Sequence, residues 1–227
     1  MSEFGFESTP RRGFLARMAA GAVALAAGGL ATSRAEAEGF HAALSPEWDS
    51  TWMTKIKGKY RQVFDVMEVH SGFPLIMTRI WLMTNGSGYN IPEKDLSAVT
   101  VLRHNAICMA MNDSIWAKYK LGEAFDVTDP TTNKPAERNI FAQAATFVMP
   151  PFSVGAVDKL VASGVIFCGC NMAVLHFSET TGGKVGVDKD AAYAEWKAGM
   201  LPGITLVPSG VLAVGRAQNH GCAYCGT

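Results

Sequence analysis

The sequence has little charge and no excess of either sign. Only 18% of its 227 residues are charged, and 20 lysines and arginines balance 20 aspartates and glutamates. Proteins that bind nucleic acid usually carry a basic stripe, and none is present, so the charge pattern argues against nucleic acid as a partner. Hydrophobic residues make up 48% of the chain, which excludes a disordered protein and predicts one globular domain with a core.

The sequence also lacks a long, strongly hydrophobic run. The most apolar N-terminal stretch, 18–31, is rich in alanine and glycine and is too short and too weakly hydrophobic for a stable membrane span. Arg11 and Arg12 precede it, and the small-residue sequence AEA at 35–37 follows it. This pattern is typical of a twin-arginine signal peptide over 1–37, which exports a folded protein to the bacterial periplasm. We expect no stable membrane span after its removal.

Several motifs of common enzyme classes are missing. There is no Walker phosphate-binding loop, no G-x-G-x-x-G sequence, no paired-carboxylate motif and no serine–histidine–aspartate order. A C-x-x-C pair, Cys222 and Cys225, stands near the C-terminus, but no histidine follows it directly, so covalent haem attachment is not indicated. The five cysteines and five histidines are therefore the main candidates for chemistry.

Strand-like and helix-like segments alternate along the mature chain. Residues 38–61 form a polar lead-in in which Trp48 and Trp52 could dock, and the domain proper spans 62–227. Strands are predicted at 62–69, 98–104, 165–168 and 203–210, with an edge strand in the tail after 221. This alternation predicts an α/β fold: a single domain with a mainly parallel sheet of about five strands, covered by helices on both faces.

The predicted helices fill the intervals between these strands. They are expected at 73–86, at 105–122 in two pieces, at 153–164, from Asn171 or Met172 onward, at 188–200, and after Ser209 up to Gly221. Asp113 is predicted to cap the second piece of 105–122, and Ser209 to cap the last helix. Residues 126–139 contain many turn formers and are expected to form a surface excursion.

Three of the predicted strands end in chemically reactive side chains. His70 follows the first, His104 ends the second, and Cys168 and Cys170 follow the third. Because open α/β sheets bind ligands beyond the carboxyl ends of their strands, we expect these side chains to share one rim. Cys170 would lie at a helix N-terminus, whose partial positive charge lowers the pKa of a thiol and favours the reactive thiolate. Alternatively, both cysteines are small core residues.

The cysteines also permit a metal site. Cys168, Cys170, Cys222 and Cys225 would form a tetrahedral thiolate site for copper or zinc if the tail folded back to the rim. The C-x-x-C pair could instead be a disulfide or a redox pair, and an odd number of cysteines leaves at least one free or paired between chains. Cys108 is expected in the core. Additional candidate ligands are Met109, Met111, Met149, Met172, His176 and His220.

Two segments resemble a known family. ASGVIFCGCNMAV, at 162–174, resembles the strand–cysteine–helix segment of the DsrE/DsrF-like sulfur-relay proteins, and LPGITLVPSGVLAVGRAQNHGCAY, at 201–224, resembles their closing strand–helix–strand. The strand at 62–69 and the sequence AVTVLRHNAI fit their first two strands, so the resemblance covers about residues 60–225.

The resemblance implies a compact α/β domain that assembles into trimers or hexamers. It also implies that sulfur is carried as a persulfide on a cysteine after the third strand, which by position is Cys170. The chain departs from the family pattern in its export signal, in Cys168, in the terminal C-x-x-C and in an insertion at 126–150.

These observations lead to a principal hypothesis, a periplasmic sulfurtransferase-like sulfur carrier. Cys170 would be the nucleophile, Cys168 or the C-x-x-C pair would resolve or receive the sulfur, and His104 would orient or protonate the leaving group. Its partners would be small sulfur species or a sulfur-relay protein, and further copies of this chain. The alternative is a soft-metal protein that binds copper or zinc. A third possibility is a ligand-binding assembly protein in which the cysteines are structural.

Overall fold

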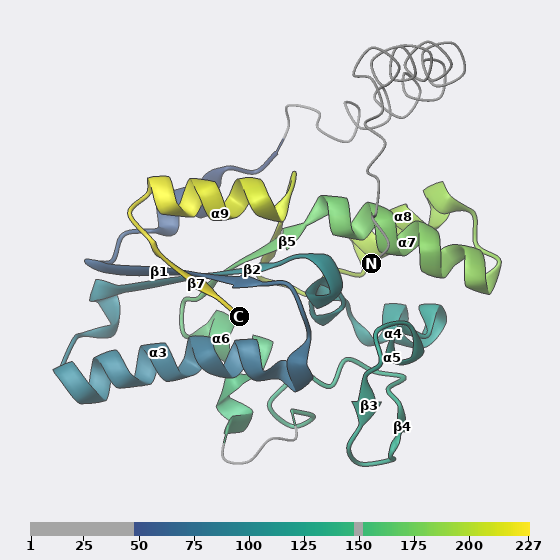
Figure 1. The fold of residues 1–227 in the computed structure, drawn as a ribbon, viewed down its shortest axis with the longest axis horizontal. Helices are drawn as coiled ribbons and strands as arrows, with labels where there is room; N and C mark the ends of the chain where they lie inside the picture. Colours follow the sequence, from purple (N-terminus) through teal and green to yellow (C-terminus); the bar gives the residue numbers. More distant parts are fainter. Residues whose placement is uncertain (1–47, 148–151) are drawn as a thin grey trace, which may run out of the picture. The chain divides into compact units, whose positions relative to one another are not determined.

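The structure, a computed structural model, describes residues 48–147 and 152–227 (Figure 1). The signal peptide predicted at 1–37, the lead-in up to residue 47 and the candidate ligand Met149 lie outside the described residues. Among the described helices, none combines the length and the hydrophobicity that crossing a membrane requires.

The centre of the domain is a five-stranded parallel sheet with the order β6-β5-β2-β1-β7 (Figure 1). Its strands are β1 Tyr60–Val66, β2 Leu96–Leu102, β5 Ile166–Cys170, β6 Ile204–Val207 and β7 Ala223–Gly226. From β1 the chain adds β2, β5 and β6 in one direction, and then places β7 on the opposite side of β1. The order therefore reverses between β1 and β7. Such a switch point is where open α/β sheets bind ligands, at the carboxyl ends of the strands.

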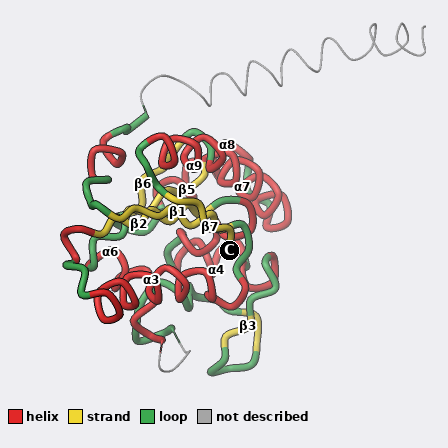
Figure 2. Tube along the Cα trace, turned by 60° about the vertical axis from the view of Figure 1, so that its left-hand side comes forward, coloured by secondary structure: helices red, strands yellow, loops and turns green. Residues whose placement is uncertain are grey.

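Helices cover both faces of the sheet, as the sequence predicts. Helix α9 (Gly210–Asn219) lies on one face, and α3 (Phe73–Tyr89) and α6 (Val157–Ala162) lie on the other (Figures 1 and 2). Helices α7 (Asn171–Val185) and α8 (Lys189–Ala198) pack against each other. The two faces are called the α9 side and the α3 side below.

Shorter elements complete the domain. The helices among them are α4 Asp113–Tyr119, α5 Leu121–Ala124 and the 3₁₀ helices η1 Thr51–Lys55, η2 His70–Gly72, η3 Glu93–Asp95, η4 His104–Ala110 and η5 Phe152–Gly155. The predicted surface excursion contains a small antiparallel pair, β3 Thr128–Asp129 and β4 Lys134–Pro135. Helix α7 contacts both η4 and α4, so these elements gather near the carboxyl ends of the strands.

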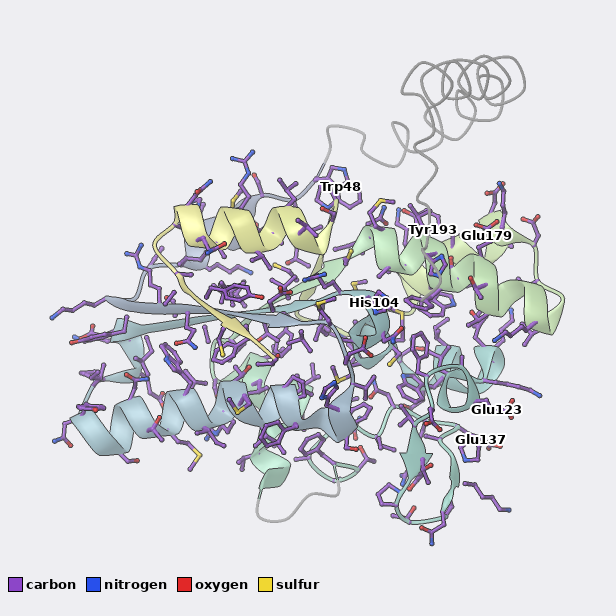
Figure 3. All side chains as sticks on the ribbon, viewed as in Figure 1. Trp48, His104, Glu123, Glu137, Glu179 and Tyr193 are labelled. Carbon is purple, nitrogen blue, oxygen red and sulfur yellow. The ribbon has the colours of Figure 1, made fainter. Side chains whose placement is uncertain are left out.

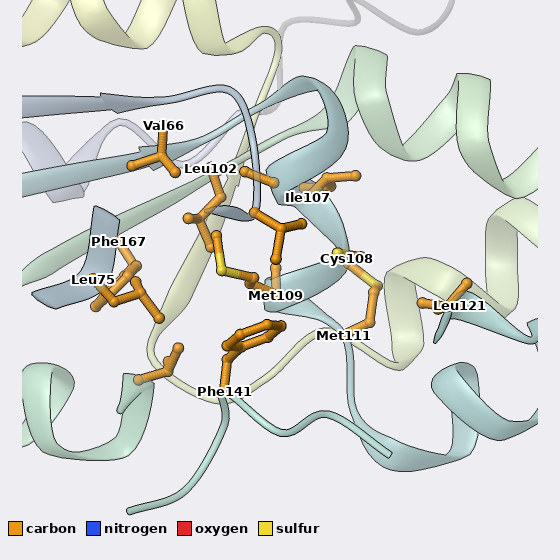
Figure 4. Packing of buried hydrophobic residues seen from close by; sticks show 14 of the residues in the cluster. Val66, Leu75, Leu102, Ile107, Cys108, Met109, Met111, Leu121, Phe141 and Phe167 are labelled. Carbon is orange, nitrogen blue, oxygen red and sulfur yellow. The ribbon is translucent and has the colours of Figure 1, made fainter. Parts of the chain in front are cut away.

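The alternation of side chains along the strands creates two hydrophobic cores. In β1, Val63 belongs to the core on the α9 side, whereas Phe64 and Val66 belong to the core on the α3 side. The α3-side core is the larger one and includes Leu75, Leu102, Met109, Phe141 and Phe167 (Figure 4). Trp52 is buried in the α9-side core, so it docks as predicted. Each fully buried leucine, methionine or phenylalanine side chain in these cores contributes roughly 1.5–3 kcal/mol to stability.

Some element boundaries differ from the prediction. β1 ends at Val66 rather than at residue 69, because the carbonyl groups of Val66 and Met67 accept hydrogen bonds from Arg103 and Ala106 in the turn after β2. β5 continues beyond Cys168 to Cys170, because Gly169 and Cys170 still pair with β6. Cys168 is therefore an interior strand residue.

The helical segment predicted at 105–122 also differs in detail. Its first piece is the 3₁₀ helix η4, and its second piece is α4. The cap of α4 is Asn112 rather than Asp113, because the Asn112 Oδ1 accepts a hydrogen bond from the Ile115 amide at 3.1 Å. Asp113 instead accepts a hydrogen bond from the Asn139 amide at 2.9 Å, which ties the excursion to the helix.

Candidate functional site

Strand β5 places Cys170 at the carboxyl edge of the sheet, directly before α7. The backbone of Cys170 is extended, with φ −75° and ψ 113°, and Asn171 is the first helical residue. Cys170 pairs with Val207 of β6. On the other side, Leu102 of β2 pairs with Gly169, so the next residue of the chain after Leu102, Arg103, lies next to Cys170. The thiol is nearly covered: Cys170 is 6% exposed and also packs against the α3-side core.

A buried carboxylate near the end of β1 holds Arg103. Asp65 is 4% exposed, although aspartate is rarely buried without a partner. The Arg103 guanidinium donates two hydrogen bonds to it, from Nε to Oδ1 at 2.6 Å and from Nη2 to Oδ2 at 2.8 Å. The Tyr224 hydroxyl of β7 donates a third, to Oδ2 at 3.0 Å. This two-point pairing fixes the plane and the position of the guanidinium.

The pKa values of these groups show how strongly the charges are coupled. Burial alone would raise the pKa of the Asp65 carboxyl, but the hydrogen bonds from Arg103 and Tyr224 outweigh burial and hold the pKa below its ordinary value. The hydrogen bond to Asp65 raises the pKa of Tyr224. Both groups therefore keep their ordinary charge states at neutral pH, with Asp65 ionised and Tyr224 a hydrogen-bond donor.

The start of α9 packs on the aliphatic part of the Arg103 side chain. The Ser209 Oγ accepts a hydrogen bond from the Leu212 amide at 3.1 Å and caps the helix, as predicted from the sequence. A Cβ atom at Gly210 would lie 2.6 Å from the Arg103 Cβ atom, so only glycine allows the helix to approach this closely. The first turn of α9 thus lies directly on the Arg103 side chain.

Several charges act on the guanidinium of Arg103. The hydrogen bond to Asp65 raises its pKa most, burial opposes this increase, and the charges of Asp65, Tyr224 and Cys170 raise the pKa further. Because Nε and Nη2 bind Asp65, Nη1 is left without a hydrogen-bond partner among residues 48–147 and 152–227. Asp65, Arg103, Tyr224 and Cys170 are together called the rim cluster.

Cys168 lies in a different environment from Cys170. It is fully buried in the α9-side core, where it pairs with Val101 of β2 and Thr205 of β6. Burial raises the pKa of its thiol far above the ordinary value. The structure therefore does not bring Cys168 to the rim, and its thiol remains protonated.

His104 is exposed at the turn after β2 (Figure 3). Its Nδ1 atom lies 3.1 Å from the Glu68 Oε1 atom, within hydrogen-bond distance, and its ring makes an edge contact with Phe177 of α7. The backbone of His104 is left-handed, with φ 50°, a conformation that is uncommon outside glycine. His70, the other predicted rim histidine, lines a separate cavity on the α3 side.

The two cysteines of the C-x-x-C pair face opposite sides of the sheet. Cys222 is buried in the α9-side core, where burial raises the pKa of its thiol, whereas Cys225 packs against the α3-side core. All five cysteines are unbonded in the structure. In the described ranges, no three histidine, cysteine, aspartate or glutamate side chains are grouped so that they could hold a metal ion. The four cysteines of the predicted metal site are thus not brought together.

The remaining candidates have mainly structural surroundings. Cys108 is fully buried, as predicted, and burial raises the pKa of its thiol. Met109 and Met111 are core residues, and Met172 packs against the same core. His176 is exposed beside Phe177, and His220 is exposed with its Nδ1 atom 2.8 Å from the Arg216 carbonyl oxygen.

Sequence reasoning missed three members of the rim cluster. Asp65 had a visible signal, since a carboxylate in the apolar run VFDV needs a buried partner. Arg103 immediately precedes His104, but only the pairing of strands shows that it lies between Asp65 and Cys170. Tyr224 reaches Asp65 because β7 returns to the far side of β1, which no local pattern reveals.

The sequence matches no family model, and no curated protein is similar to it.

Proposed function

We propose that this chain is a sulfur-handling protein of the DsrE/DsrF type, which carries sulfane sulfur as a persulfide on Cys170. One observation supports the proposal most: Cys170 lies at the carboxyl edge of the sheet, at the N-terminus of α7, and the neighbouring strand ends in Arg103, whose charge interacts with it. The resemblance of segments 162–174 and 201–224 to that family points to the same residue.

Two positively charged features lie near Cys170, the N-terminus of α7 and the side chain of Arg103. The N-terminus of a helix carries a partial positive charge and stabilises a nearby anion. Arg103 is a second positive group, although its charge is paired with Asp65, which fixes the position of its side chain. Burial raises the pKa values of the Cys108 and Cys168 thiols, so these two cysteines remain protonated.

The transfer proceeds in two displacement steps without net oxidation. The Cys170 thiolate attacks the terminal sulfur of a donor persulfide, R–S–SH. A new S–S bond forms on Cys170, the donor S–S bond breaks, and the thiolate R–S⁻ leaves and takes up a proton. An acceptor thiolate then attacks the outer sulfur of the Cys170 persulfide, which releases the Cys170 thiolate again.

His104 is the group we assign to protonate the leaving thiolate. Its Nδ1 atom is engaged with Glu68, which leaves Nε2 for proton transfer. Cys168 is not assigned the resolving role, because it is buried and protonated in the α9-side core. The acceptor is therefore a thiol outside this cluster, on a small sulfur species or on a sulfur-relay protein.

Export and assembly belong to the same proposal. The twin-arginine pattern at 1–37 supports a periplasmic location, and the family resemblance supports a trimer or hexamer of this chain. Because Cys170 is 6% exposed, a small donor has better access to it than a bulky one.

Intact mass spectrometry on anaerobically purified protein tests the assignment. The chain is incubated with inorganic polysulfide as sulfur donor, with and without subsequent reductant. Wild type should gain the mass of sulfur in a form that reductant removes, and Cys170→Ser should gain none. Cys225→Ser is the matched control, because Cys225 is more exposed than Cys170 and would be loaded first if exposure alone decided.

Each alternative has its own signature in the same experiment. Sulfur loading that persists in Cys170→Ser would overturn the proposal. A metal-sized mass seen only in the native spectrum, and lost on replacing Cys168 and Cys170, would favour the soft-metal alternative. Cysteines that are all disulfide-bonded or inert would favour the structural role.

A further inference from the structure

A cavity lies on the α3 side of the carboxyl edge of the sheet. It has a volume of about 460 Å³ and lies between the turn after β1 and the 125–147 region. Small-molecule sites typically have volumes of roughly 300–1,000 Å³. No member of the rim cluster lines the cavity. The residues that line it are Glu68, Val69, His70, Ser71, Asn105, Phe125, Asp126, Val127, Thr128, Pro130, Ile140, Phe141 and Phe147.

The backbone around this cavity is held in uncommon conformations. His70, Ser71 and Asp126 have φ values of 40°, 53° and 52°, in the left-handed region that non-glycine residues rarely adopt. Gly72 follows with φ 82°, and a Cβ atom there would lie 2.7 Å from the Phe147 ring. Strained residues persist where the surrounding structure holds them, and they cluster at ligand sites.

One wall of the cavity is a rigid apolar surface. The rings of Phe141 and Phe147 meet edge to face with their centroids 6.2 Å apart, and both residues are buried against the α3-side core. Asn139 anchors this wall. Its Nδ2 donates hydrogen bonds to the carbonyl oxygens of Met109 and Met111 at 2.9 and 2.6 Å, and its Oδ1 accepts one from the Phe141 amide.

The polar lining contains two carboxylates beside neutral side chains and one histidine. Glu68 and Asp126 supply two carboxylates, and among the described lining residues none is lysine or arginine. Glu68 is positioned by a hydrogen bond from the Asn105 amide group at 2.8 Å and by its contact with His104. Arg138, which lies in the same loop region, is paired with Asp129 at 3.0 Å. The cavity thus combines aromatic walls with negative charge.

We propose that this cavity binds a small organic cation, a primary amine with an aromatic or aliphatic body. Its ammonium group would be held by Glu68 and Asp126, and its body would lie on the apolar surface formed by Phe141 and Phe147.

An NMR titration of the full chain with 2-phenylethylammonium tests this inference. Two probes of matched shape, neutral 2-phenylethanol and anionic phenylacetate, separate the contribution of charge from that of the apolar body. The ammonium probe should shift amide signals of residues 68–71 and 125–128. The alcohol should bind roughly tenfold more weakly, and phenylacetate should not bind measurably.

A pair of carboxamide variants gives the internal control. Asp126→Asn should weaken binding of the ammonium probe about fivefold, the size of one partly exposed ion pair, and asparagine tolerates the left-handed backbone at this position. Glu179→Gln removes an exposed carboxylate of α7 that does not line the cavity (Figure 3), so it should leave binding unchanged. Equal affinity for the alcohol and the ammonium probe, unchanged binding in Asp126→Asn, or signal shifts confined to other residues would each overturn the inference. Cys170→Ser should bind the probe normally, which separates this site from the rim cluster.

Discussion

The two parts of the carboxyl edge differ in how their charges are balanced. In the rim cluster, the charge of Arg103 is matched by Asp65 at two points, and α9 packs on the aliphatic part of the Arg103 side chain. In the cavity on the α3 side, no lysine or arginine of the described lining matches Glu68 and Asp126. In the functions proposed above, the rim cluster would therefore accommodate a small anion such as a thiolate, and the cavity a cation.

Alternation of side chains along the strands produces this difference. Asp65 occupies a position of β1 that faces the α9 side, as Val63 does, whereas Val66 beside it belongs to the α3-side core. The turns that follow β1 and β2 bring Glu68, His70 and Asn105 to the α3-side cavity. Two chemically different environments thus arise within a few residues of the same strand ends.

Replacing Asp65 should have the largest effect, because the rim cluster depends on it. Asp65→Asn leaves the guanidinium of Arg103 without a countercharge. We expect the free energy of unfolding at neutral pH to fall by about 3 kcal/mol, measured by urea denaturation. In the double variant Asp65→Asn/Arg103→Met, much of the loss should be recovered, because no uncompensated charge remains. A single variant as stable as wild type would contradict the buried pair.

The stability difference between wild type and Asp65→Asn should depend on pH. The pKa of Asp65 is lower in the folded state than its unfolded value of about 3.9, so its stabilising contribution is fully present above that value. It is lost as the pH falls through the folded-state pKa. The stability difference between wild type and Asp65→Asn should therefore be constant from about pH 7 to about pH 5 and shrink below about pH 4. A difference that grows on acidification would contradict this assignment.

Much of the fold could be predicted from the sequence, because it depends on local patterns. The order of strands and helices, the Ser209 cap, the edge strand in the tail and the buried Cys108 all follow from hydrophobic periodicity and turn chemistry. The errors lie at element boundaries: β1 stops early, β5 continues, and α4 is capped by Asn112 rather than by Asp113. The limits of the strands depend on pairing with neighbouring strands, which a single segment does not encode.

The site was predicted less completely for the same reason. The position of Cys170 directly before a helix could be predicted because a helix start after a strand is a local signal. Its partner Arg103 is fixed by strand pairing, and the link from Arg103 through Asp65 to Tyr224 spans three strands. The cavity was missed because its aromatic wall comes from the excursion, which the sequence presents as turns, and becomes visible only when Asn139 ties it to the core.

Gly72 offers a way to disturb the cavity alone. In Gly72→Ala the alanine must adopt a left-handed backbone conformation. Its methyl group would also lie 2.7 Å from the Phe147 ring and 3.0 Å from the Phe141 ring. We expect the free energy of unfolding to fall by about 2 kcal/mol and binding of 2-phenylethylammonium to weaken, while sulfur loading of Cys170 is unchanged.

A second glycine gives the control for this substitution. Gly183 lies in α7, and a Cβ atom there would meet nothing within 4 Å. Gly183→Ala should therefore raise the free energy of unfolding by about 0.5–1 kcal/mol, because alanine favours the helix. If both alanine variants changed stability in the same direction, the close packing at Gly72 would not be the cause.

Ser209 lies on the α9 side of the sheet, opposite the cavity, and its replacement should change the free energy of unfolding only slightly. Ser209→Ala removes the hydrogen bond that caps α9, so the first helical turn, which lies on Arg103, becomes less stable. Loss of such a cap costs about 1 kcal/mol, measurable by urea denaturation. Ser114→Ala, an exposed position in the first turn of α4 that does not cap it, should be nearly neutral. Because α9 and the cavity lie on opposite faces of the sheet, Ser209→Ala should leave binding of 2-phenylethylammonium unchanged. If Ser209→Ala instead weakened both amine binding and stability, the rim cluster and the cavity would be coupled.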